Sequence, residues 1–198
     1  MLAGETLESR AGSAFMAGGA MILASLVAPV ALGTVVEWGW AVGVGLVGLG
    51  VLATTAGLLG LYHHAAEGSP LFAKVGATGA TVAGLAGAGL VGLVGVAGVT
   101  VAVGRPTSVE PVRLFVGLGL TVAVGLSTGF LSFGIPTWRA GTPSRTVGKL
   151  LTGGGAVLLA ATGGELLRTL FEMGPPPGVV FPVLLLVAVD GLVVGRYL

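Results

Sequence analysis

The chain is poor in charge and has no cysteine. Only 9% of its 198 residues are charged and 54% are hydrophobic, whereas a soluble domain carries roughly a quarter charged residues. This composition excludes a water-soluble domain. A net charge of +1 without any basic run excludes a nucleic-acid partner, because phosphate binding needs clustered Lys and Arg. Without cysteine, the chain has no disulfide, thiolate metal ligand or cysteine nucleophile.

Groups that carry chemistry are also scarce. His63 and His64 are the only histidines, so the paired intramembrane imidazoles of a haem site are missing. Together with Glu67 they have a spacing that suits a metal, but without a fourth ligand they are more typical of interfacial polar residues that close a helix. The dinucleotide-like motif at 43–48 lies inside an apolar run with no preceding strand. We therefore expect no cofactor, no metal and no enzymatic activity.

Long uncharged apolar runs dominate the sequence. A helix that crosses the hydrocarbon core needs about 20 mostly apolar residues. Six runs of roughly this length occur, at about 11–36, 41–62, 75–103, 114–135, 150–171 and 179–195. They predict an all-α fold, in which residues 1–198 form a single integral membrane domain with a polytopic bundle of about six transmembrane helices. The longest predicted loops are 63–74 and 136–149, and Pro136 is expected to end the fourth helix.

The orientation of the bundle follows from its cations, because Lys and Arg in short loops favour the cytoplasmic side. With the N-terminus inside, the inner cations are Arg10, Lys74, Arg139, Arg145, Lys149 and Arg196, and the outer ones are Arg105, Arg113 and Arg168. Both termini are therefore predicted to be cytoplasmic. The excess of Ala, Val, Leu and Gly, with more Arg than Lys, is typical of a GC-rich prokaryotic genome. We expect a multi-pass protein of a prokaryotic cell (plasma) membrane.

Glycine is the residue in greatest excess, with 38 of 198 positions. Small residues recur at every fourth position within the apolar runs. The clearest series are Gly76, Ala80, Gly84, Ala88 and Gly92, then Gly117, Thr121, Gly125 and Gly129, and finally Thr152, Ala156, Ala160 and Gly164. Such stripes allow the backbones of membrane helices to approach closely. The sequence therefore predicts a tightly packed bundle.

Charged residues inside membrane spans are costly, and each is a functional hypothesis. Glu165 and Arg168 lie three positions apart near the outer end of the fifth run, where they would form a charge pair facing the headgroups. Asp190 in the sixth run has only apolar residues three and four positions away. Any partner for its carboxylate must therefore come from another helix.

A layer of hydroxyl groups is predicted at the depth of Asp190, about 9–12 Å from the inner surface. Its members are Thr54, Thr55, Thr81, Ser127, Thr128 and Thr152. A carboxylate among hydroxyls could bind a proton or a small cation. The alternative is that the hydroxyls bond to carbonyls of their own helices and that Asp190 is hydrated from the cytoplasm.

Two functions are expected from these features. The small-residue stripes and the lack of catalytic groups favour a structural or partner-binding membrane subunit. Its partners would be the lipid bilayer and either another membrane protein or a second copy of the chain. The alternative is a carrier or channel for a small solute or ion that uses Asp190. A water-filled cavity reaching Asp190 would favour the carrier, whereas a dry bundle with an exposed face of small residues would favour the subunit.

Overall fold

The computed structural model describes residues 2–32, 39–102, 110–141, 144–170 and 180–198. These residues form helices and short connections only, which confirms the all-α prediction. The helices are α1 (Leu2–Leu32), α2 (Gly39–Gly60), α3 (Tyr62–Gly68), α4 (Pro70–Ala102), α5 (Glu110–Ala140), α6 (Arg145–Leu170) and α7 (Val180–Tyr197).

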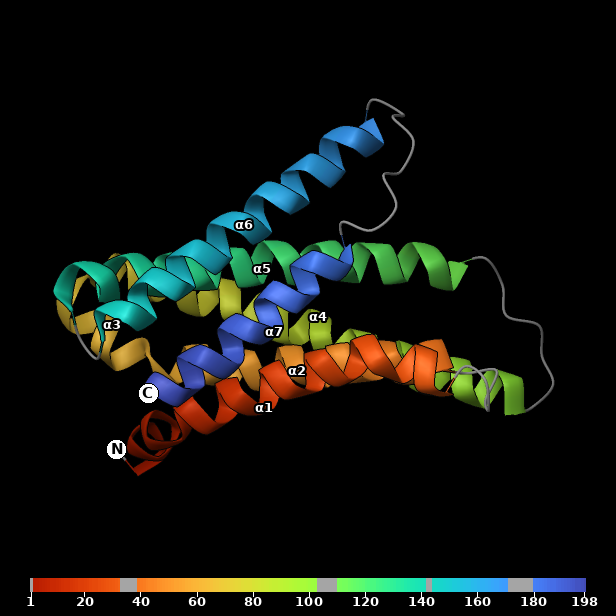
Figure 1. The fold of residues 1–198 in the computed structure, drawn as a ribbon, viewed down its shortest axis with the longest axis horizontal. Helices are drawn as coiled ribbons and strands as arrows, with labels where there is room; N and C mark the ends of the chain where they lie inside the picture. The colour runs from red at the N-terminus through yellow and green to blue at the C-terminus, as the bar shows by residue number, and fades with distance from the viewer. Residues whose placement is uncertain (1, 33–38, 103–109, 142–143, 171–179) are drawn as a thin grey trace.

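The long helices run alternately in opposite directions (Figure 1), and their contacts form a closed ring. The neighbouring pairs are α1–α2, α2–α4, α4–α5, α5–α6, α6–α7 and α7–α1, and α3 packs against α4 and α5. Both termini lie at the same end of the bundle, and the C-terminal half of α6 diverges from the other helices (Figure 1). The ring therefore has one interior, to which every long helix contributes.

Four of the helices are long and apolar enough to cross a membrane. The segments are Arg10–Ala28 in α1, Ala41–Gly60 in α2, Pro70–Val99 in α4 and Leu114–Ala140 in α5. The chain therefore has the character of a helical membrane protein. The fifth and sixth predicted runs correspond to α6 and α7. Over their described residues, these two helices are not among the four that are long and apolar enough to cross a membrane.

Both predicted long loops are largely helical, so these two predictions were wrong. Apart from Ser69, residues 63–74 belong to α3 and to the first turn of α4, which begins at Pro70. Proline suits a first helical position because the amide it lacks would have no partner there. In the second segment Pro136 is buried within α5 and does not end it.

Gly141 ends α5, five residues after Pro136. It has a φ of 75°, and its amide donates to the carbonyl of Thr137 at 2.9 Å. This is the left-handed C-terminal cap that glycine adopts without steric cost. Proline is tolerated inside membrane helices because neighbouring groups satisfy the backbone carbonyl that it leaves free.

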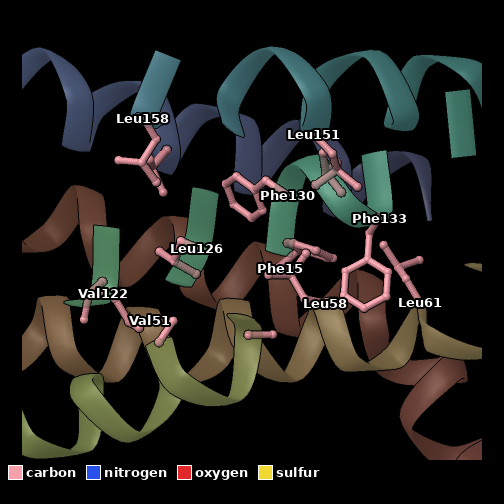
Figure 2. Close-up of a cluster of buried hydrophobic side chains, with 14 of the residues drawn as sticks. Phe15, Val51, Leu58, Leu61, Val122, Leu126, Phe130, Phe133, Leu151 and Leu158 are labelled. Carbon is pink, nitrogen blue, oxygen red and sulfur yellow. The ribbon is translucent and has the colours of Figure 1, made fainter. Parts of the chain in front are cut away.

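Large side chains fill the interior of the ring. Phe15 of α1, Leu58 of α2, Phe130 and Phe133 of α5 and Leu151 of α6 are almost completely buried and lie in one cluster (Figure 2). Phenylalanine rings face glycines of neighbouring helices. A Cβ added to Gly57 would lie 2.7 Å from the ring of Phe15. Glycine on one helix thus makes room for an aromatic side chain on the next.

At other glycines the backbones themselves meet. A Cβ added at such a position would lie only 2.5–2.7 Å from a carbonyl oxygen of the adjacent helix. These contacts place Gly19 against Ala188, Gly195 against Gly12, Gly48 against Gly87 and Gly125 against Gly79. Any side chain there would push two helices apart, because the opposing atoms belong to rigid backbone. The predicted tight packing is therefore present at the α1–α7, α2–α4 and α4–α5 contacts.

The predicted stripes serve two surfaces. In α4 the first members, Gly76, Ala80 and Gly84, are buried, whereas Ala88 and Gly92 are exposed. The reason is that a step of four residues advances about 40° beyond a full turn, so the stripe winds by about 160° from Gly76 to Gly92. In α5 the members divide in the same way: Gly117 and Thr121 are exposed, and Gly125 and Gly129 are buried.

Two glycines of α5 give a matched test of this packing. Gly125→Leu should destabilise the protein by about 1–3 kcal/mol or more, because the new side chain meets the backbone of α4. Gly117→Leu should change stability by less than about 0.5 kcal/mol, since no described atom lies within 4 Å of a Cβ at Gly117. Unfolding in mixed detergent micelles measures both. Equal losses for the two variants would contradict the packing described.

Candidate functional site

Asp190 is a buried carboxylate in α7, the helix that packs between α1 and α6. Only 9% of its surface is exposed. The carboxylate points at α6, where a Cβ added to Gly154 would overlap Oδ2. The ring of Phe130 lies beside the same position, 3.7 Å from that added Cβ. The carboxylate therefore occupies space that a side chain at position 154 would take.

The carboxylate of Asp190 has no counter-charge among the described side chains that surround it. Oδ2 is buried and accepts no hydrogen bond from the described part of the chain. Residues 11–32 of α1, 114–138 of α5 and 150–164 of α6 contain no titratable side chain. A buried carboxylate without a partner costs several kcal/mol, so its presence needs a reason. This is the strongest sign of a functional group inside the bundle.

The predicted hydroxyls do not form hydrogen bonds to Asp190 in the described structure. Thr54 and Ser127 are buried and donate to the carbonyls of Gly50 and Ala123 on their own helices. Thr81, Thr128 and Thr152 likewise donate to carbonyls four residues earlier, and Thr81 is exposed. This is the behaviour expected of hydroxyls that serve as small packing groups.

Thr55 differs from the other predicted hydroxyls. Its Oγ1 is buried and has no hydrogen-bond partner in the described residues, and its methyl carbon lies 3.0 Å from a Cβ added at Gly84 of α4. Thr55 therefore belongs to the α2–α4 contact, whereas Asp190 faces α6. The structure thus distributes the predicted layer over several helix contacts.

The predicted outer charge pair lies in α6, whose backbone is helical through both positions. The side chains of Glu165 and Arg168 lie outside the described part of the structure. His63, His64 and Glu67 lie on α3, and no group of three potential metal ligands occurs among the described residues.

A second candidate surface is the exposed side of α4. Six exposed residues follow one another at alternating steps of four and three, and we call them the α4 outer face: Thr81, Leu85, Ala88, Gly92, Gly95 and Val99. No described atom lies within 4 Å of a Cβ added at Gly92 or Gly95. Alternating steps of three and four keep residues on one side of a helix and are typical of helix–helix seams. The predicted series from Gly76 to Gly92 contains only Ala88 and Gly92 of this face, because the face alternates steps of four and three.

Comparisons of the chain with protein-family models, with curated proteins and with solved structures find no match. The function of the chain is therefore inferred from its own geometry.

A double-mutant cycle tests the contact between Asp190 and Gly154. Gly154→Ala should destabilise the protein by about 1–3 kcal/mol, because the new methyl group meets the carboxylate. In an Asp190→Ala background the same change should cost much less, since the carboxylate is gone. Unfolding in mixed micelles measures each variant.

Gly153→Ala is the control for this cycle, because no described atom lies within 4 Å of a Cβ at Gly153. It should shift stability by less than about 0.5 kcal/mol in either background. Equal costs of Gly154→Ala with and without Asp190 would show that the two residues do not meet.

Proposed function

We propose that the chain is a six-span protein of a prokaryotic plasma membrane and acts as a subunit that binds another transmembrane helix. The spans are α1, α2, α4, α5, α6 and α7, and both termini are cytoplasmic. We include α6 and α7 because both belong to the ring of helices. In this ring α7 packs against α6 on one side and against α1 on the other. We propose no enzymatic role, because Asp190, the buried charged group of the described interior, has no second titratable group on the facing stretches of α1, α5 and α6.

The orientation is supported by where the cations lie. Arg10, Lys74 and Lys149 lie in the first part of α1, α4 and α6, and Arg139 and Arg196 lie in the last turn of α5 and α7. These helix ends gather at the end of the bundle that holds both termini (Figure 1). Cations favour the cytoplasmic side, so this end is assigned to the cytoplasm.

The observation that carries the proposal is the α4 outer face. On the inner side of α4, Gly79 and Gly87 lie against the backbones of neighbouring helices. Gly92 and Gly95 on the outer side likewise leave the helix backbone uncovered, and no described atom lies within 4 Å of a Cβ added at either position. Between membrane helices, close approach at small residues is what supplies packing energy. The α4 outer face is therefore suited to receive a helix from a second copy or from another membrane protein.

Site-specific photocrosslinking in native membranes tests this function. A photoreactive phenylalanine analogue at Leu85, which is 70% exposed on the α4 outer face, should form protein adducts. The same analogue at Val27 of α1, which is 63% exposed, should form lipid adducts only. Gly92→Leu should reduce the Leu85 adduct about fivefold or more, because overpacking a close helix contact costs about 1–3 kcal/mol.

The mass of the Leu85 adduct distinguishes a second copy from a different protein. Lipid adducts alone at both positions, or a protein adduct that Gly92→Leu leaves unchanged, would contradict the proposed partner surface.

A carrier of protons or small cations is the second candidate, and the unpartnered Oδ2 of Asp190 is the observation that favours it. In liposomes with an imposed potential, the protein should then carry a proton or sodium flux. Asp190→Asn should abolish that flux, because the amide cannot bind and release a proton or neutralise a cation. Glu67→Gln, an exposed position on α3, is the matched control. Equal flux through the wild-type and Asp190→Asn proteins, or none through either, would reject the carrier.

A further inference from the structure

A groove lies on the outside of the bundle between α4 and α5. Its volume is about 670 Å³, and Thr162 of α6 contributes to its lining. Gly79 and Gly125 lie at its floor, Val75, Val82 and Val124 line its walls, and Lys74 lies at one end. On α4 the lining extends from Lys74 to Val82, a length of about 12 Å along the helix.

The groove exists because α4 and α5 meet at glycine. A Cβ added to Gly125 would lie 2.7 Å from the carbonyl oxygen of Gly79, so the floor is backbone and carries no side chain. The hydroxyls of Thr78, Thr121 and Thr128 in the lining donate to carbonyls of their own helices. Their hydrogen-bonding capacity is thus used within the helix, and the groove is apolar along its length.

The end of the groove at Lys74 is cationic. Lys74 is exposed one turn after the start of α4, four residues inside the apolar segment Pro70–Val99. Arg139 in the last turn of α5 and Arg145 and Lys149 in the first part of α6 are also exposed, and these helix ends lie at the same end of the bundle as the start of α4 (Figure 1). Cations placed between transmembrane helices at the membrane surface attract anionic lipid headgroups.

We propose that this groove binds one acyl chain of an anionic phospholipid, with the lipid phosphate held at Lys74. In the proposed membrane arrangement, on which this inference rests, the groove faces the hydrocarbon region and runs along the helices as a lipid tail does. Its cation then lies near the end of α4, where a headgroup would lie. The charge of Lys74 complements the phosphate, and the apolar walls take the chain below it. This proposal is independent of the partner surface on α4, because its lining residues Val75, Val82 and Val124 are not part of that face.

Native mass spectrometry of the intact protein in mild detergent tests the headgroup contact. Phosphatidylglycerol and phosphatidylcholine with identical acyl chains serve as probes. The wild-type protein should retain phosphatidylglycerol in preference to phosphatidylcholine. Lys74→Gln should reduce phosphatidylglycerol binding about fivefold, as expected for one cation near an anionic headgroup. Lys149→Gln, the other lysine of the chain, should reduce it much less because Lys149 does not line the groove.

A bulky residue in the groove tests the acyl-chain contact. Val124→Trp should block retention of phosphatidylglycerol, whereas Val116→Trp should not, because Val116 is exposed on the same helix outside the lining. Glycerol phosphate, which has the headgroup charge without the chain, should not compete.

Several results would overturn the proposal. Equal effects of Lys74→Gln and Lys149→Gln would show a diffuse charge effect, and undiminished binding to the Val124→Trp protein would place the chain elsewhere. Competition by glycerol phosphate would indicate a free-anion site. A crosslink from Val124 to a second copy of the chain would assign the groove to a helix.

Discussion

Contact between helix backbones at glycine is the interaction on which the structure depends. Carbonyl oxygens of one helix lie where a side chain of the next would be, as at Gly19 with Ala188 and at Gly125 with Gly79. These contacts bring α1 to α7 and α4 to α5 closely enough to close a ring whose interior is filled by Phe15, Leu58 and Phe130. In lipid, where apolar burial gives helices little drive to associate, such close packing supplies the attraction.

The same device creates each of the three candidate functional features. Asp190 fits inside the bundle because Gly154 on α6 has no side chain. The groove below Lys74 is hollow because α4 and α5 meet at Gly79 and Gly125. Two residues of the α4 outer face, Ala88 and Gly92, belong to a small-residue series that winds away from the bundle after Gly84. Glycine therefore contributes both to the packing of the helices and to the Asp190 site, the groove and the α4 outer face.

Apolarity alone predicted that the chain is all-α and contains long apolar helices, because that property depends on each segment by itself. The helix ends depended on local chemistry: the sequence around Pro136 suggested a stop, but the backbone continued to the left-handed cap at Gly141. The stripes identified small residues but not their faces, since a four-residue repeat drifts on a helix of 3.6 residues per turn. The burial of Asp190 could be anticipated from its place in an apolar run. Its contact with Gly154 could not, because the pairing of α6 with α7 is a tertiary relation.

Closure of the ring by glycine contacts is tested most directly at the α1–α7 contact. The measurement is the separation of these two backbones in an experimental structure of the intact protein in lipid nanodiscs. We predict that Gly19 lies against the backbone of α7 at Ala188 and that Gly12 lies against Gly195, with no side chain between the helices. An α7 that lies apart from α1, or that reaches it only through side chains, would contradict the closed ring.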